Sequence, residues 1–476
     1  MSTLKSFFKD TFIYGIAAVL PKAINVLLVS LYTATLTTSQ FSVNTVFYVY
    51  IAYLNILLTY GMETAFFRFF SREKNKGEVV STAFISLFVT TVFALIVLLW
   101  FSHPIAQFMG FTDPVFLKMM IGIAILDALV VIPFAYLRVE GKSIQYAGFK
   151  IVSILIYAFF NLYFLWYMPK GQNLNWFDPS LKEGYIFLAN LIASAFVFIG
   201  VLPLMFKVKW SFNWVLWKKM FKYSWPVLVA GIAYTTNENL DKLVLEDLIG
   251  PDAMGAYAGA YKIGVMMTLY ITAFRLGAEP FFFNQAKEKN ATNSYALITK
   301  WFSIIGVLFL LSIVVFIHPI ASIFLRSPAY FEALDIVPII LAANLFLGIY
   351  NNLSIWYKLI DRTKFGMYIS IIGALITVFL LFKTIPIYGY IAAAWATFIA
   401  YGIMMISSYL LGQKFFKIPY DIAKIGLYLI IGIGASFIHF YYFDKNYYIG
   451  SVLILGLALL VFILERKQLK QLMKRF

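Results

Sequence analysis

The sequence predicts an all-α integral membrane protein with fourteen transmembrane helices, arranged as two pseudo-symmetric six-helix lobes plus two C-terminal helices. Of its 476 residues, 62% are hydrophobic and only 13% are charged, which is far outside the composition of soluble globular domains. The apolar runs extend from end to end and leave no polar stretch long enough to fold as a soluble domain. Basic residues also concentrate in alternate connecting segments, as they do in multi-span membrane proteins.

Each predicted span is an apolar run bounded by charged, Pro, Gly or Asn residues, with a length near the ~20 residues that a helix needs to cross the hydrocarbon core. The first run is too long for the apolar region of a signal peptide, so we expect it to remain as the first span. The first seven spans are Phe12–Leu36, Phe41–Phe67, Val79–Phe101, Val115–Leu137, Ile151–Met168, Tyr185–Phe206 and Trp225–Leu245. The last seven are Ala256–Phe274, Trp301–Ile320, Ile336–Trp356, Phe365–Phe382, Tyr388–Leu411, Ile425–Tyr442 and Tyr447–Leu464.

The basic residues predict the orientation of these spans. With the N-terminus inside, the inner segments hold 28 of the 38 Lys and Arg residues, the outer segments hold 6, and four lie within spans. This asymmetry predicts that both termini are cytoplasmic. The net charge of +16 is therefore mostly an orientation signal, and we expect no nucleic-acid partner.

Two features divide the chain into lobes. Residues 207–222, KVKWSFNWVLWKKMFK, place three Trp and one Phe at helical spacing beside lysines, which predicts an amphipathic helix in the cytoplasmic interface. The pattern G-x-E-x-x-F-F occurs at Gly61 and again at Gly277, which indicates six-span repeats of equal orientation. The predicted parts are the N-lobe (residues 1–206, spans one to six), the linker (207–222), the C-lobe (223–413, spans seven to twelve), and spans thirteen and fourteen with a basic tail (414–476).

Charged side chains within the spans mark the candidate functional site, because each costs about 2.5 to 3.5 kcal/mol at the bilayer centre unless it pairs or meets water. The candidates are Lys22, Glu63, Asp127, Glu238, Asp241, Lys242, Lys262, Arg275 and Glu279. Lys22 and Asp127 lie near the midplane, where they form either an ion pair that ties two helices or part of a wet cavity. Pro21 breaks a backbone hydrogen bond beside Lys22 and is a candidate hinge.

The sequence argues against an enzyme. It contains no Cys and only three scattered His, which excludes thiolate chemistry and makes a His-cluster metal site improbable. The longest outer segment, about residues 169–184, is too short for the acid/base groups that a membrane-bound polymerase or ligase needs at an aqueous face. We expect no metal and no cofactor beyond a coupling ion, H⁺ or Na⁺.

Several segments resemble the polysaccharide transporter branch of the multidrug, oligosaccharidyl-lipid and polysaccharide exporter (MOP) superfamily. The resemblance covers nearly the whole chain, although its motifs are loose patterns. It rests on GMETAFFRFF from Gly61, NENLDKLVLEDLIGPDAMGAYAGAYKIG from Asn237, ITAFRLGAEPFFFNQ from Ile271, YKLIDRTK from Tyr357 and IPIYGYIAAAWAT from Ile385.

The resemblance implies an O-antigen-type flippase of the bacterial inner membrane, in the pathway of lipopolysaccharide and other surface polysaccharides. Such a protein moves an undecaprenyl-diphosphate-linked oligosaccharide to the outer leaflet by alternating access, and its partners are membrane lipid, this glycan and the polymerase or export machinery. The cations expected to hold the diphosphate are Lys22, Lys262, Arg275 and Lys242. The carboxylates expected to bind the coupling ion or to gate are Asp127, Glu238, Asp241, Glu63 and Glu279.

Two alternatives stay open at this point. A lipid II flippase of the same superfamily also has fourteen spans and an anionic lipid substrate. A multidrug or cation antiporter of the superfamily typically has twelve spans, and basic residues in both lobes fit an anionic substrate better than a cationic drug.

Overall fold

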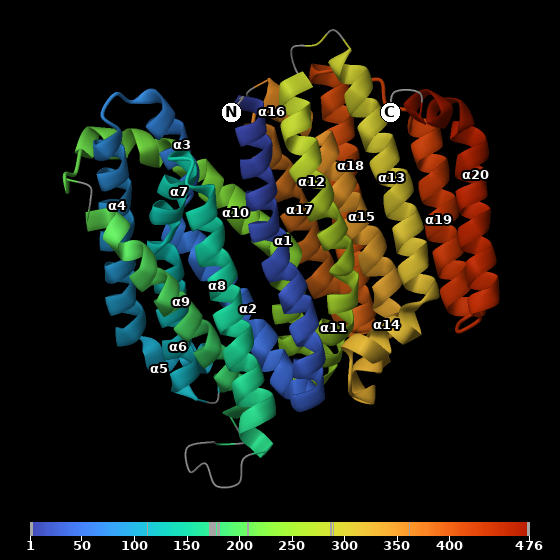
Figure 1. The fold of residues 1–476 in the computed structure, drawn as a ribbon. Coiled ribbons are helices and arrows are strands. Elements are labelled where there is room, and N and C mark those ends of the chain that lie inside the picture. Colours follow the sequence, from blue (N-terminus) through green and yellow to red (C-terminus); the bar gives the residue numbers. More distant parts are fainter. Residues whose placement is uncertain are drawn as a thin grey trace. The chain divides into compact units, whose positions relative to one another are not determined.

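The computed structural model describes residues 3–111, 113–170, 178, 181–206, 209–285, 288, 290–360 and 362–473, and within these ranges it contains helices and no strands. The chain divides into two compact units, Met1–Ala258 and Gly259–Phe476. The boundary falls inside a helix, so that the whole segment that follows the predicted linker, up to Ala258, belongs to the first unit. Figure 1 shows the first unit in blue to green and the second in yellow-green to red.

The first unit is built from long apolar helices whose ends carry recognisable capping residues. Thr37 and Gln40 form a capping box at the start of α2, and Asp113 caps α6 with Pro114 in its first turn. The helices are α1 (Thr3–Thr35), α2 (Thr38–Thr59), α3 (Met62–Arg72), α4 (Lys76–Trp100), α5 (Ser102–Phe108), α6 (Pro114–Leu129), α7 (Val131–Val139), α8 (Ser143–Leu162), α9 (Lys182–Phe206), α10 (Trp214–Ile249) and the first part of α11 (Pro251–Gly264). A π-helical turn, Tyr163–Tyr167, continues α8.

The second unit has its core around α15, and a 3₁₀ segment, Pro328–Ile336, leads into that helix. In the span Pro328–Leu359, which contains α15, 89% of the most apolar stretch is buried, against 17% in the span that contains α20. The helices are the end of α11, α12 (Met266–Gln285), α13 (Ala291–Val315), α14 (Ile317–Phe324), α15 (Val337–Leu353), α16 (Ile355–Leu359), α17 (Lys364–Tyr388), α18 (Tyr390–Phe415), α19 (Ile422–Tyr442) and α20 (Tyr447–Met473).

Twelve helical segments of the described chain are long and apolar enough to cross a membrane, and each coincides with one of the fourteen predicted spans. The other two predicted spans lie on α10 and on α11 with α12. Helix α10 is less apolar because it carries Glu238, Asp241 and Lys242, and a turn at Val265 separates α11 from α12. The protein is thus an all-helical, multi-pass membrane protein, while the count of fourteen and the orientation of the termini stay predictions.

The segment predicted as a separate interfacial helix is partly the start of α10. Lys207 and Val208 lie outside the described residues, and α10 begins at Trp214 with Asn213 as its cap. Trp214, Trp217 and Phe221 stack in a row, with ring centroids 4.7 and 5.2 Å apart. Part of this segment packs inward, because the Trp217 indole donates to Ser86 Oγ at 2.6 Å. The division into lobes at residues 207–222 stays a prediction.

The two copies of the G-x-E-x-x-F-F pattern have different local structures. Gly61 has a φ of +72° and is the residue directly before α3, in the turn between α2 and α3, whereas Gly277 lies inside α12. A Cβ at Gly61 would lie 2.7 Å from the carbonyl oxygen of Ser224, so glycine is also needed there for close approach to α10. The predicted repeat is therefore not matched by equal backbone conformations at these two glycines.

Candidate functional site

Asp127 lies in α6, and its carboxylate accepts a hydrogen bond from Ser194 Oγ of α9 at 2.9 Å. Lys150, which we expected in an inner loop, lies within α8 and is close enough to interact electrostatically with this carboxylate. Its ammonium group also lies 4.6 Å from the ring centroid of Phe134. The described contacts of Asp127 therefore come from Asn55 of α2, Lys150 of α8 and Ser194 of α9, and the alternative of an ion pair with Lys22 of α1 stays untested.

A network of tyrosine hydroxyls and amide side chains lies between α1, α2, α8 and α9 of the first unit. The hydroxyl of Tyr157 is 2.9 Å from that of Tyr32 and 3.2 Å from that of Tyr48. Tyr32 donates to Asn161 Oδ1 at 3.1 Å, and Asn190 donates to the Tyr48 hydroxyl at 3.3 Å. Asn161 is fully buried. The first unit thus holds several polar groups at membrane depth that satisfy one another.

Sequence reasoning missed this tyrosine and asparagine network, and it also missed Lys150. The available signal was an amide in an otherwise apolar run: Tyr157 and Asn161 are spaced i, i+4, which places them on one face of a helix. The partners of these residues come from helices more than 100 positions away, which no local pattern could indicate.

Three of the predicted site residues lie together on α10. Lys242 Nζ is 2.9 Å from Asp241 Oδ1 and donates to the carbonyl oxygen of Glu238 at 2.8 Å. Tyr257 of α11 donates to the other Asp241 oxygen at 2.6 Å. The side chains of Lys242 and Asp241 are 8% and 3% exposed. The pair of Asp241 and Lys242 is charge-neutral, buried and hydrogen-bonded, which is typical of a structural contact within the first unit.

Lys22 differs from Lys242, because its side chain is exposed although it lies in the interior of α1. Pro21 precedes it inside the same continuous helix. Of the other predicted cations, Arg275 of α12 is exposed and Lys262 of α11 is half-buried. The side chain of Glu279 lies outside the described part of the structure.

Glu63 forms an ion pair with Arg138 that joins α3 to α7. The distance between Glu63 Oε1 and Arg138 Nη1 is 3.2 Å, and both side chains are 44% exposed. The Arg138 guanidinium also lies 4.8 Å from the ring centroid of Phe67. An exposed pair of this kind contributes at most about 1 kcal/mol to stability, so it can break and re-form at little cost.

A close contact joins the α1–α2 turn to the start of α11 within the first unit. Thr38 Oγ1 donates to Asp252 Oδ1 at 2.6 Å. A Cβ at Gly255 would lie only 1.9 Å from the carbonyl oxygen of Thr38, so the two backbones touch. This contact lies at the end of α2 that the basic residues predict to be the outer end.

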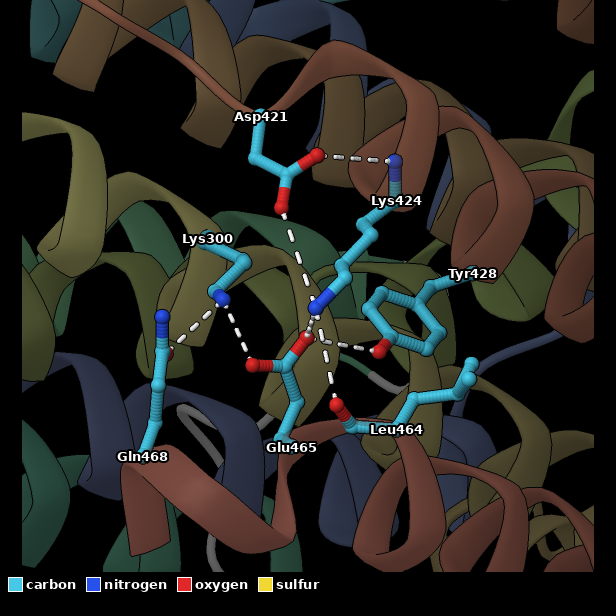
Figure 2. Close-up of polar contacts among 7 residues, drawn as sticks. All are labelled: Lys300, Asp421, Lys424, Tyr428, Leu464, Glu465 and Gln468. Carbon is cyan, nitrogen blue, oxygen red and sulfur yellow. Dashed lines mark hydrogen bonds and ion pairs between the residues drawn. The ribbon is translucent and has the colours of Figure 1, made fainter. Parts of the chain in front are cut away.

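The second unit contains a buried ionic cluster around Glu465 of α20, which Figure 2 shows. One carboxylate oxygen is 2.6 Å from Lys300 Nζ of α13, and the other is 2.9 Å from both Lys424 Nζ and the Tyr428 hydroxyl of α19. Lys300 also donates to Gln468 at 2.8 Å. Glu465 and Lys300 are 0% and 3% exposed, so the cluster ties α19 and α20 to α13. Lys300 was counted with the inner segments; it lies within α13, which begins at Ala291, and its depth relative to the membrane stays a prediction.

Comparisons with known proteins identify families and solved structures that are similar to this chain. The sequence matches the polysaccharide biosynthesis protein family over residues 7–284, and the MatE family over residues 226–382. No curated protein is a match in sequence.

Several solved structures are similar in fold. The lipid II flippase MurJ in an inward closed conformation is 15% identical, with a TM-score of 0.73 over 96% of this chain and 100% of that chain. An inward-facing multidrug resistance MATE family transporter of the MOP superfamily is 13% identical, with a TM-score of 0.66 over 83% of this chain and 94% of that chain. A MOP superfamily transporter from Pyrococcus furiosus, described as having a binding pocket of reversed polarity, is 13% identical with a TM-score of 0.62, over 86% of this chain and 95% of that chain.

The matched families and the similar structures are transporters and flippases and not enzymes. Their members include multi-pass proteins of the bacterial inner membrane, and this chain is one as well. Because the first family match extends over more than half of the sequence, it assigns the chain to that family. The chain belongs to the polysaccharide biosynthesis protein family, within the MOP superfamily of transporters and flippases.

Proposed function

We propose that the protein moves a polyprenyl-diphosphate-linked oligosaccharide from the cytoplasmic to the outer leaflet of the inner membrane by alternating access. The observation that carries this proposal is Lys22, an exposed cation in the interior of an apolar helix. Facing lipid at mid-depth would cost about 2.5 to 3.5 kcal/mol, whereas a water-filled cavity that receives a diphosphate would stabilise the charge. Family membership supports a substrate of polysaccharide biosynthesis.

In this proposal Lys22, Lys262 and Arg275 hold the diphosphate. Lys242 is left out of this set, because its ammonium group is buried against Asp241, the carboxylate that Tyr257 of α11 also bonds. Pro21 lacks the backbone N–H that would continue the hydrogen bonding of α1, and it remains the proposed hinge next to Lys22.

The proposed coupling-ion site is Asp127. Its carboxylate lies at membrane depth and accepts a hydrogen bond from Ser194. This environment fits a carboxylate that binds H⁺ or Na⁺ in one step of transport and releases it in another. Glu63 is proposed to gate, because its exposed pair with Arg138 joins two helices weakly. Glu238, Asp241 and Glu279 stay proposed members of the coupling or gating set. The polysaccharide polymerase or export machinery remains a proposed partner.

The experiment compares export in cells that carry Lys22→Ala, Lys22→Arg or Lys118→Ala in place of the wild-type chain. Lys118 is an exposed cation near the start of α6 and serves as the matched control. We expect Lys22→Ala to abolish surface polysaccharide at a wild-type level of membrane-inserted protein, and Lys22→Arg and Lys118→Ala to retain export. Normal surface polysaccharide in Lys22→Ala would remove Lys22 from the mechanism.

The second candidate is a lipid II flippase, which the full-length similarity to MurJ favours. Both substrates are diphosphate lipids, so the cations alone do not distinguish them. Depletion of the protein separates the two: loss of surface polysaccharide with continued growth supports oligosaccharide export, and arrest of cell-wall growth supports lipid II. The proposed multidrug antiporter activity predicts instead that depletion raises drug sensitivity and leaves both polymers intact.

A further inference from the structure

The second unit contains an apolar crevice that the proposed transport does not use. It has a volume of about 200 Å³ and lies between α13, α15, α18 and α19. Side chains from α15 form its floor, where Ile349 and Leu353 are 3% and 5% exposed. At its mouth, Ile406 of α18 and Ile422 of α19 are 53% and 47% exposed. The crevice thus opens between α18 and α19 onto the apolar surface of the unit.

One end of the crevice adjoins a segment that carries charged side chains. On α19 the lining residues extend from Ile422 to Leu429, a depth of about 10 Å at 1.5 Å of rise per residue. The segment that joins α18 to α19 contributes Tyr420 to the lining at this end. It carries the exposed Lys417 and also Asp421, whose carboxylate lies 3.9 Å from Lys424 Nζ. The basic residues predict that this end faces the cytoplasm, where the leaflet surface is anionic.

The wall that α19 contributes is held in position from behind. Lys424 and Tyr428 of α19 bond Glu465 on one side of the helix, while Ile422, Gly426 and Leu429 line the crevice. The ionic cluster therefore fixes the orientation of α19, which makes the crevice a preformed feature of the unit.

Gly426 leaves space that a side chain would fill. A Cβ built at this position has no atom within 4 Å, although Gly426 lines the crevice. An apolar cavity of about 150 Å³ stays dry and takes up small hydrocarbons, so a slightly larger apolar crevice in a membrane is expected to hold hydrocarbon rather than water. The hydrocarbon available at this surface is a lipid acyl chain.

We propose that this crevice binds the upper part of an acyl chain of an anionic membrane phospholipid, with the headgroup phosphate beside Lys417. The acyl chain fits the apolar walls, and the ammonium group of Lys417 complements the phosphate at the end predicted to lie nearest the membrane surface. None of the cations proposed to bind the transported substrate lines this crevice.

The test measures phospholipid bound to the purified full-length protein by native mass spectrometry, during titration with phosphatidylglycerol. Gly426→Leu fills the crevice, and Gly434→Leu is the matched control, since Gly434 is also in α19 with no atom within 4 Å of its Cβ but does not line the crevice. We expect Gly426→Leu to weaken the tightest phosphatidylglycerol site at least fivefold and Gly434→Leu to leave it unchanged. If Gly426→Leu does not fold, Ile406→Trp blocks the mouth from the exposed side and has the same expected effect.

The headgroup is tested with Lys417→Ala and with phosphatidylcholine of the same chain length. We expect Lys417→Ala to reduce the preference for phosphatidylglycerol over phosphatidylcholine while binding of both lipids persists. The proposal is overturned if folded Gly426→Leu binds phosphatidylglycerol like the wild type. It is also overturned if the crevice retains a polyprenyl phosphate in preference to phospholipid, in a competition between the two.

Discussion

Substitution of Gly255 by alanine should separate the α1–α2 turn from α11. The added Cβ would lie 1.9 Å from the carbonyl oxygen and 2.5 Å from the carbonyl carbon of Thr38. Both atoms belong to the backbone, so no side-chain rotation relieves the overlap. If transport opens the first unit at its predicted outer end, this contact is one that must break.

The size of the effect follows from the same distances. Ordinary van der Waals contact begins near 3.4 Å, so the two segments must move apart by about 1.5 Å, which is 3.4 minus 1.9. The same movement lengthens the 2.6 Å hydrogen bond from Thr38 to Asp252 to about 4 Å and breaks it. Overpacking costs about 1 to 3 kcal/mol, and the hydrogen bond to a carboxylate adds about 1.5 kcal/mol, offset by about 1 kcal/mol of helix propensity. A net loss of about 2 kcal/mol corresponds to roughly a thirtyfold shift toward the separated arrangement.

Spin-label distances provide the assay, because the chain contains no native cysteine. Labels at Ser39→Cys and Ala253→Cys report the separation of the α1–α2 turn from α11. We expect Gly255→Ala to shift the distance distribution to longer values. Gly148→Ala is the control, since its Cβ meets no atom within 4 Å in α8, and it should leave the distances unchanged and the melting temperature equal or higher. An unchanged distribution in Gly255→Ala, at the wild-type melting temperature, would refute the close contact.

Three further predictions concern other contacts. Glu465→Gln should lower the free energy of unfolding in denaturant by about 3 to 5 kcal/mol, because it leaves the buried Lys300 without its carboxylate. A second change, Lys300→Met, should recover part of this loss. A Glu465→Gln variant as stable as the wild type would contradict the buried pair. Asp127→Asn should insert and fold normally but stop polysaccharide export, if the carboxylate binds the coupling ion, and normal export at equal protein level would exclude that role. Gly61→Ala should lower the melting temperature, because its φ of +72° and the 2.7 Å approach to a carbonyl oxygen of α10 both oppose a side chain; an unchanged melting temperature would show that the α2–α3 break tolerates alanine.

Much of the helical organisation could be predicted from the sequence, since twelve predicted spans coincide with long apolar helices. Whether a helix can cross the membrane depends on the length and apolar composition of one run of residues, so the sequence alone is enough to predict the spans. Lys150 and Lys300 were counted with the inner segments, and both lie inside helices, α8 and α13, that begin before the apolar runs used to find the spans. The sequence did not indicate the partner of Lys300, a carboxylate from a helix 165 positions later.

The candidate site was harder to predict than the helices. Charged residues in apolar runs identified Lys22, Asp127 and the group on α10, but not their partners. The pairing of Lys242 with Asp241 and of Tyr257 with the same carboxylate depends on how α10 meets α11. Spacing within one helix shows which residues share a face, but it does not show what that face contacts.

The sequence by itself determined that this protein crosses the membrane many times, and its basic residues predict how it is oriented. It also determined which few charges are expensive enough to need a function or a partner, because hydration energies belong to individual residues and runs. Only the tertiary structure decided how those charges are satisfied, as at Glu465, and where a missing side chain leaves room, as at Gly426. The physical reason is that hydrogen bonds, ion pairs and cavities are properties of facing helices, and residues far apart in the chain create them.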